Sequence, residues 1–249
     1  MKIYLFLLSL GVSCVFAAND TKSDVITEAN MNAYMDYVLI QFGPFINSMG
    51  WIPMDLPDIV EGFEAKPILI TYRGELKLTN GVLDEFQGTA RSGNSMMYYD
   101  KMLLRVSTST NLRNIRYRFD YSAKIWNLGP TGWLEGGTDK FIMHTDILID
   151  ITDFYIYMQD FRVEKIGSVW TKLHGNILVD WLANAIINTM SFIFRGILRD
   201  FISDKFRENV QEVIDEINNN MHGKFSSVED VVQYLAKMSE NGFVDAPKY

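Results

Sequence analysis

His144 is the residue whose neighbours are best suited to metal or acid–base chemistry. It lies in a segment that also contains Asp139, Asp146 and Asp150. An imidazole among carboxylates is a donor set that can bind zinc, and Asp150 with Asp153 could act as an acid and a base. One histidine with scattered carboxylates is also what a solvated strand face presents, and Asp153 suits a turn. We favour this structural interpretation, with a metal site as the alternative.

Spaced catalytic motifs are absent from the sequence. It contains no G-x-S-x-G nucleophile elbow, no H-E-x-x-H zinc motif, no P-loop and no G-x-G-x-x-G turn. Its one cysteine, Cys14, lies in an apolar N-terminal segment. We therefore predict that the protein is not an enzyme and uses no cofactor or metal. A lipid-ester hydrolase is the remaining enzymatic alternative.

The N-terminus has the three parts of a cleaved signal peptide. Lys2 supplies a positive charge, residues 3–16 are apolar, and the small residue Ala17 follows. A membrane span needs about 20 apolar residues and the polar run 19–24 comes next, so a retained anchor is the weaker alternative. We predict a signal peptide at residues 1–17, cleaved after Ala17 or Ala18, and a secreted, extracellular protein.

Composition limits the partners of the mature chain, residues 18–249. The net charge of −8 becomes −9 when Lys2 is removed, and no basic cluster stands out. Binding to nucleic acid depends mostly on phosphate neutralisation, so we predict no nucleic-acid partner. Hydrophobic residues make up 48% of the chain, enough for a sizeable core in one domain without disulfides. The sequence does not indicate whether the protein forms oligomers.

Apolar periodicity divides the chain into helical ends and a strand-rich middle. Helical spacing predicts an N-terminal helix at 24–48 and a short helix at 227–239. Alternation of apolar and polar residues predicts antiparallel strands across 66–174, with Asn80-Gly81 as a tight hairpin and Gly136-Gly137 as another turn. The expected strands are 67–79, 82–91, 97–108, 115–125, 139–152, 154–163 and 168–174.

A long helix is predicted at 176–221, and its two halves differ. The first half is apolar around most of its circumference, apart from a narrow polar stripe of Asp180, Asn184, Asn188, Ser191, Arg195 and Arg199. That stripe would lie in lipid if the helix spanned a membrane, so we predict no stable membrane insertion. The second half has a narrow apolar stripe on the side of the first half's polar stripe. We therefore expect a break or bend near 200–204, or a change of packing surface.

These elements predict an α+β fold in which a long helix is wrapped by a highly curved antiparallel sheet. Such an arrangement tends to leave a tubular apolar gap, which flexible methionine side chains line well. We expect a ligand's hydrocarbon along residues 181–194, with any polar head near Arg195 or His174. The predicted lining comes from the strands at Tyr117, Phe119, Met143, Ile147 and Ile149, and from the helix at Trp181, Ile186, Met190, Phe192 and Phe194.

The order of elements resembles that of the mite group 7 allergens and their insect relatives. Three stretches carry the likeness: residues 74–86, 150–167 and 173–176. The resemblance implies one half of the tubular lipid-binding fold, shared with bactericidal/permeability-increasing protein, juvenile-hormone-binding proteins and takeout-like proteins. It also implies carriage of a lipid-like ligand. Hormone-binding and takeout-like proteins usually begin with a disulfide-bonded cysteine pair, which this mature chain lacks, so the likeness favours the allergen-like branch.

Two functions from different classes follow. The first is a secreted, non-enzymatic carrier that binds a hydrophobic small molecule or lipid in an apolar tunnel, driven by burial of apolar ligand surface. The alternative is a secreted interaction or pattern-recognition protein without a true ligand tunnel. A filled core between helix and sheet would favour the alternative.

Overall fold

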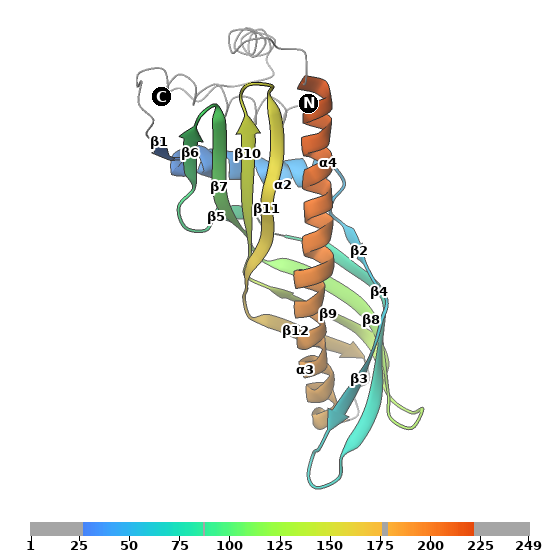
Figure 1. Ribbon diagram of the computed structural model, residues 1–249. Helices are drawn as coiled ribbons and strands as arrows, with labels where there is room; N and C mark the ends of the chain where they lie inside the picture. The colour runs from blue at the N-terminus through green and yellow to red at the C-terminus, as the bar shows by residue number, and fades with distance from the viewer. Residues whose placement is uncertain (1–26, 87, 176–178, 222–249) are drawn as a thin grey trace.

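Two antiparallel sheets and one long C-terminal helix dominate the structure (Figure 1). The structure is a computed structural model and describes residues 27–86, 88–175 and 179–221. The predicted signal peptide at 1–17 and the predicted helix at 227–239 lie outside the described residues. The strands and helices together confirm the α+β class.

Each sheet has six strands. Sheet A contains, in spatial order, β1 (Thr27–Asn30), β6 (Met96–Asp100), β7 (Leu103–Leu112), β10 (Phe141–Asp150) and β11 (Tyr155–Ile166), and β5 (Thr89–Arg91) also pairs with β7. Sheet B contains β12 (Val169–Gly175), β9 (Thr131–Thr138), β8 (Ile115–Lys124), β4 (Tyr72–Glu85) and β2 (Met54–Leu56), and β3 (Ile59–Ala65) pairs with β4.

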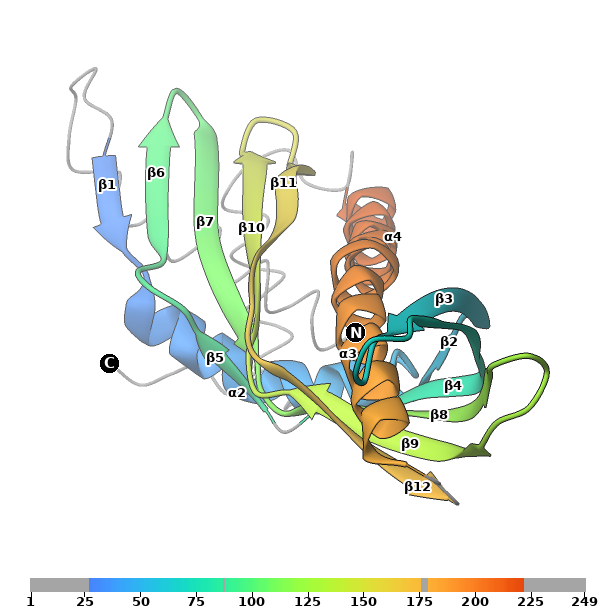
Figure 2. The ribbon, with the colours of Figure 1, turned by 90° about the horizontal axis from the view of Figure 1, so that it is seen from below.

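The helices are α2 (Asn32–Ser48), α3 (Asp180–Ile197) and α4 (Ser203–Met221). Figure 2 shows sheet B curving around α3, while sheet A extends away on the other side of the helix. In Figure 1, α4 continues upward beside β11 at the edge of sheet A. One long helix therefore packs against both sheets.

Strand β8 illustrates how the alternating pattern becomes a dry face. Its inward residues are Ile115, Tyr117, Phe119, Tyr121 and Ala123, and all five are buried. The residues between them are exposed or half-buried, because successive side chains of a strand point to opposite faces. The prediction for 115–125 is confirmed, and the predicted strands 139–152, 154–163 and 168–174 correspond to β10, β11 and β12.

The predicted hairpin at Asn80-Gly81 is wrong. Strand β4 runs through both residues, and its register with β8 shifts between Thr79 and Val82. This β-bulge places Asn80 in the left-handed region, with φ of 52°. A Cβ on Gly81 would lie 2.0 Å from Cε1 of Phe119, so the glycine leaves room for that ring. The Asn-Gly pair bends one long strand and does not end it.

Two other strand predictions need correction. Gly136-Gly137 is not a turn but lies inside β9, where a Cβ on Gly136 would be 2.3 Å from the Tyr117 hydroxyl oxygen. The predicted strand 97–108 is instead β6 and β7, separated by a turn at Lys101 and Met102 with φ of 47° and 67°. Residues 82–91 do not form one strand, because β4 ends at Glu85 and β5 begins at Thr89.

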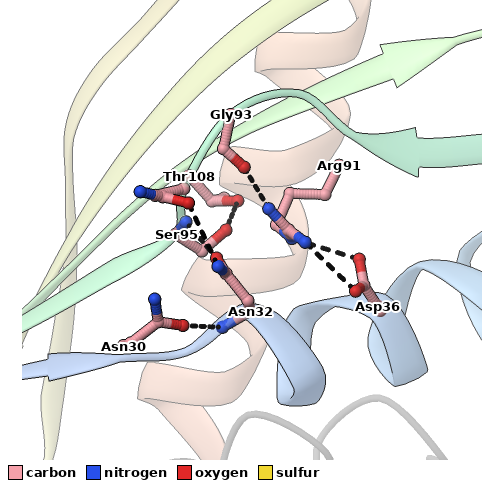
Figure 3. A network of polar contacts seen from close by, with 8 residues as sticks. Asn30, Asn32, Asp36, Arg91, Gly93, Ser95 and Thr108 are labelled. Carbon is pink, nitrogen blue, oxygen red and sulfur yellow. Dashed lines mark hydrogen bonds and ion pairs between the residues drawn. The ribbon is translucent and has the colours of Figure 1, made fainter.

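The N-terminal helix begins later than predicted. Residues Thr27–Asn30 form β1, which pairs with β6, and α2 starts at Asn32. The Asn30 side chain accepts a hydrogen bond from the Asn32 amide at 2.9 Å, and the Asn32 side chain accepts one from the Ser95 amide at 2.8 Å (Figure 3). These bonds fix the strand-to-helix junction against sheet A. In the predicted connector 51–58, Met54–Leu56 forms β2.

The regular α-helical structure of the long helix is interrupted where the sequence predicts a break or bend. The five residues Leu198–Ile202 form a π-helical turn between α3 and α4. A π turn absorbs an extra residue, which rotates everything after it relative to a continuous α-helix. The helix begins at Asp180, since Val179 is extended, and residues 176–178 lie outside the described ranges. By length and composition alone, Asp180–Asn219 could cross a membrane, a property that a core helix shares.

Buried residues form two clusters along this helix. The α3 core lies mainly between α3 and sheet B, with Tyr117, Phe119, Ile186, Met190 and Phe194 among its members, and it also includes Phe141 and Met143 of β10. The α4 core lies between α4 and sheet A and is formed by Met97, Leu104, Val106, Ile149, Ile151, Ile156, Ile214 and Ile217. The predicted passage of the helix from one packing surface to another is confirmed.

Candidate functional site

Helix α3 separates its polar and apolar residues as the sequence predicts. Every fourth residue from Leu182 through Ile186 and Met190 to Phe194 is buried against sheet B. Five residues of the predicted polar stripe are exposed, namely Asp180, Asn184, Asn188, Arg195 and Arg199. A helix presents one face at this spacing, so the apolar stripe lies along the concave side of the sheet.

The rings of Tyr117 and Phe194 pack against each other in the α3 core, between β8 and the helix. Their ring centroids are 3.8 Å apart, and both side chains are almost fully buried. The Tyr117 hydroxyl lies 2.6 Å from the Thr171 hydroxyl of β12, which satisfies its polar atom. Burial raises the pKa of Tyr117, so the side chain stays neutral. The two rings form a packed layer across this part of the core.

Six of the ten predicted lining residues meet in the α3 core. They come from β8, β10 and α3 and are Tyr117, Phe119, Met143, Ile186, Met190 and Phe194. A seventh, Trp181, is half-buried and packs against this core, with its ring centroid 5.1 Å from that of Tyr72. These seven residues therefore form one continuous apolar region from the start of α3 to its last turn.

Phe192 does not line this region. Its side chain is 74% exposed. On the helical wheel it lies about 40° from Asn188 and next to Arg199, at the edge of the solvent-facing stripe. The sequence prediction assigned Phe192 to the broad apolar face of the helix, although its position borders the polar stripe.

Ile147 and Ile149 lie in the other core. Strand β10 passes both clusters: Met143 belongs to the α3 core, whereas Ile149 is buried in the α4 core with Ile147 packed against it. The alternation of β10 predicts its burial only in part, because Ile142 and Asp146 of the expected polar face are buried as well. It contains no signal for which part of the long helix that face meets, because β10 extends past both halves.

The α4 core supplies apolar residues that the predicted site omitted. Met97, Leu104 and Val106 come from β6 and β7, and Ile214 and Ile217 come from α4. On the strand side, the alternation of residue types in 103–112 is the sequence signal that could have identified Leu104 and Val106. Asn218 anchors this contact: its side chain accepts from the Ile156 amide and donates to the Ile156 carbonyl, both at 2.8 Å. One buried amide thus joins α4 to the free edge of β11.

The two predicted contacts for a polar head already have protein partners. Arg195 donates to the Gly167 carbonyl at 3.0 Å. His174 lies 3.0 Å from Glu135, stacks on Trp133 at 3.7 Å, and lowers the pKa of Glu135 through its hydrogen bond. These contacts hold both side chains at the protein surface.

Tyr121 offers a different polar group, at the same end of sheet B as His174. Within residues 27–86, 88–175 and 179–221, its hydroxyl is the one buried side-chain polar atom without a hydrogen-bond partner. Burial raises the pKa of Tyr121, so it is a neutral donor. A Cβ on Gly175 would lie 3.6 Å from this oxygen, which places it at the end of β12.

The carboxylates near His144 are arranged as structural pairs. Asp146 is 2% exposed and is held by the Arg105 guanidinium, whose pKa it raises. His144 lies 3.1 Å from the Ser109 hydroxyl and 3.6 Å from a Glu164 oxygen. In the described part of the chain, no group of three or more His, Cys, Asp or Glu side chains is arranged to hold a metal ion.

Comparison with known proteins gives one strong match. The sequence model of the Group 7 allergen family matches residues 30–214. No curated protein sequence matches significantly. Among solved structures, the chain is similar to Epiphyas postvittana Takeout 1, at 15% identity and a TM-score of 0.36, covering 84% of this chain and 93% of that one. That structural similarity is too weak to support a functional conclusion.

The family match begins at the last residue of β1, continues through α2 and both sheets, and ends at Ile214 in α4. It therefore covers the α3 core, and it covers the α4 core except for Ile217. Residues 30–214 are well over half of the 249-residue chain. The chain belongs to the Group 7 allergen family.

Proposed function

We propose that the protein is a secreted, non-enzymatic carrier of a hydrophobic small molecule or lipid, which binds along the buried face of α3. The observation that carries the proposal is the continuous apolar region from Trp181 to Phe194 inside the curve of sheet B. Burial of a hydrocarbon against such a surface is favourable by roughly 25 cal/mol per Å² of apolar area. No directional contacts are needed along the chain of the ligand, so selectivity for its hydrocarbon is expected to be broad.

A ligand must displace side chains that fill this region. Met143 and Met190 are both buried in the α3 core. Methionine has an unbranched, flexible side chain that can adopt another rotamer at low cost. Leu182, Ile186 and Met190 can therefore form the wall, with the methionine side chains making the first space for a hydrocarbon. The Tyr117–Phe194 pair would limit how far the ligand extends toward α4.

The Tyr121 hydroxyl is the proposed contact for a polar end of the ligand. It replaces Arg195 and His174 in that role, because those two side chains have protein partners. A buried donor without a partner loses the hydrogen bond that it would make to water, and a ligand carbonyl or hydroxyl could restore it. The ligand's polar end would then lie near the end of β12, where α3 begins.

Binding of a fluorescent fatty acid by the purified full-length protein tests the proposal. Ile186→Phe adds bulk to the buried face, and we expect at least tenfold weaker binding. Phe192→Leu changes an exposed side chain of the same helix and should leave binding unchanged. Thermal unfolding checks that both variants fold. If Ile186→Phe does not fold, Ile186→Val provides the second test and should change the preferred chain length of the probe.

Tyr121→Phe separates the polar contact from the apolar one. It removes only the hydroxyl, so binding of the fatty-acid probe should weaken by about two- to tenfold, the effect of one net hydrogen bond. Binding of a probe that is a hydrocarbon throughout should not change. Fatty-acid binding by the variant that is as tight as that of the wild type would reject Tyr121 as the polar contact. A wild-type protein that binds neither probe and carries no lipid in native mass spectrometry would reject the carrier function.

The alternative proposal is a secreted interaction or pattern-recognition protein that binds through its surface. The observation that favours it is the close packing of Tyr117 on Phe194, which fills part of the space that a tunnel would occupy. In that case a partner, such as a microbial lipopeptide, would bind at the surface and leave the surroundings of Trp181 and Met190 unchanged. Chemical-shift changes confined to exposed residues would support this alternative.

A further inference from the structure

Two neighbouring turns expose large apolar side chains. The β3–β4 turn presents Ile68 at 83%, Leu69 at 84% and Ile70 at 63% exposure. The β8–β9 turn presents Trp126 at 81% and Leu128 at 79%. Single exposed apolar residues are normal, but two such groups at one end of a molecule mark an interaction surface. We call these five residues the apolar tip.

The apolar tip lies at the end of the molecule where α3 begins (Figure 1). Strands β4 and β8 are paired, so their two turns are neighbours at this end. The Tyr72 ring links them, with its centroid 5.9 Å from that of Trp126 and 5.1 Å from that of Trp181. A row of three aromatic rings therefore runs from the apolar tip to the first turn of α3.

The conformation of the β8–β9 turn directs Trp126 outward. The main chains of Ile125 and Leu128 exchange two hydrogen bonds, at 2.8 and 3.0 Å. The two residues between them, Trp126 and Asn127, both adopt positive φ, 51° and 67°. This tight turn is usually made by glycine or asparagine, and a tryptophan there is both strained and solvated. Folding therefore does not explain the presence of an indole at this position.

Charge distinguishes the two turns from the rest of the chain. Residues 66–73 and 124–130 contain Lys66, Arg73 and Lys124 and no acidic residue, although the chain as a whole carries a net charge of −8. Lys66 and Lys124 are exposed; just outside these ranges, Glu64 pairs with Arg73 at 2.6 Å and the exposed Glu75 lies opposite Lys124 in the β4–β8 register. Exposed apolar side chains flanked by cations complement a phospholipid layer, whose acyl chains lie beneath a layer of phosphate groups.

Shape favours a lipid surface over a protein partner. The apolar tip consists of two narrow turns that project from paired strands (Figure 1). A stable protein interface usually buries about 800 Å² on each partner in a well-packed patch. Two projecting turns fit poorly against a flat protein surface, whereas a lipid layer adapts to them and accepts tryptophan at its polar boundary.

We propose that the apolar tip docks the protein on a phospholipid surface. The docking is peripheral: the turns enter the headgroup region and the rest of the molecule stays in water. The row formed by Trp126, Tyr72 and Trp181 then lies between the lipid and the first turn of α3. This inference needs only a bilayer that meets the tip, so it can be tested independently of the carrier function.

Co-sedimentation of the full-length protein with phosphatidylcholine vesicles, with and without phosphatidylglycerol, tests the docking. We expect the wild type to bind both. The double variant Leu69→Asp/Trp126→Asp should lose at least tenfold in vesicle affinity. The matched control Ile40→Asp changes a side chain of α2 that is 69% exposed and distant from the tip, and it should bind like the wild type. Brominated phospholipids should quench the fluorescence of the wild type more than that of Trp126→Phe.

Three outcomes would overturn the proposal. The first is a wild type that binds neither type of vesicle, and the second is a double variant that binds both as well as the wild type does. The third is a dimeric wild type with a monomeric double variant in analytical ultracentrifugation, which would assign the tip to self-association. Fatty-acid binding in solution separates this inference from the carrier function, because the double variant should keep that binding even when vesicle binding is lost.

Discussion

The α3 core and the α4 core use the same long helix but different side chains. The α3 core contains most of the large, fully buried aromatic rings, among them Tyr117, Phe119 and Phe194. The buried members of the α4 core are aliphatic or methionine, and its helix contact includes a buried asparagine. The first core is therefore held mainly by the fit of large rings, and the second by smaller side chains and one polar contact.

From this difference we expect one helix to tolerate substitution less at one site than at another. Rings that meet across a strand and a helix leave few alternative arrangements, because interiors are packed at crystal-like density. Aliphatic and methionine side chains have more ways to fill a given volume. We expect the Tyr117–Phe194 layer to be the least tolerant part of the core, with the apolar regions on either side tolerating more substitution.

Phe194→Ala should have the largest effect among the substitutions that test this comparison. It removes a fully buried ring from the α3 core, and we expect a loss of about 3–5 kcal/mol in the free energy of unfolding. Phe192→Ala, two residues earlier, should change it by less than about 0.5 kcal/mol because that ring is exposed. Denaturant titration measures both. Equal losses would contradict the assignment of the two rings to opposite sides of α3.

Asn218→Ala should have an intermediate effect and tests the α4 core. It removes two hydrogen bonds to the main chain of Ile156, and we expect a loss of about 1–3 kcal/mol. Hydrogen exchange of the Ile156 amide gives a local measurement, since that proton loses its acceptor. Asn218→Asp keeps an acceptor for this amide and should protect it better than alanine. An unchanged exchange rate in Asn218→Ala would mean that α4 does not hold the edge of β11.

Tyr117→Phe should have the smallest effect and sharpens the account of the α3 core. The ring stays in place against Phe194, and the hydroxyl loses its contact with the Thr171 hydroxyl and a longer hydrogen bond to the Trp170 carbonyl at 3.5 Å. We expect a loss of about 0.5–1.5 kcal/mol. A double-mutant cycle with Thr171→Val measures the coupling between the two hydroxyls. Coupling near zero would show that ring packing alone holds this layer together.

Sequence patterns predicted the elements whose environment is uniform along their length. The alternation of β8 gave its buried face correctly because one sheet face meets one core over all ten residues. The polar stripe of α3 was equally clear, since one side of that helix faces solvent throughout. In both cases the burial of a residue depends on its local period and needs no knowledge of the rest of the fold.

The errors occurred where distant residues decide the local structure. Asn80-Gly81 has the composition of a hairpin, but Phe119 of the adjacent strand occupies the space beside Gly81. Gly136 is similar, because its missing side chain makes room for Tyr117. Ile149 was assigned to the wrong core because periodicity gives the face of a strand and not the partner of that face. These are tertiary effects, and a single sequence contains no local signal for them.

The π-helical turn at Leu198–Ile202 determines which side of α4 faces sheet A. Each residue in an α-helix turns the following side chains by about 100°, so one residue more or less changes the direction of all that follow. Deletion of a single codon within this turn would restore a plain α-helix and rotate Ile214 and Ile217 away from sheet A. Substitutions can accumulate on both sides of the turn, whereas its length is constrained by the two surfaces that the helix must meet.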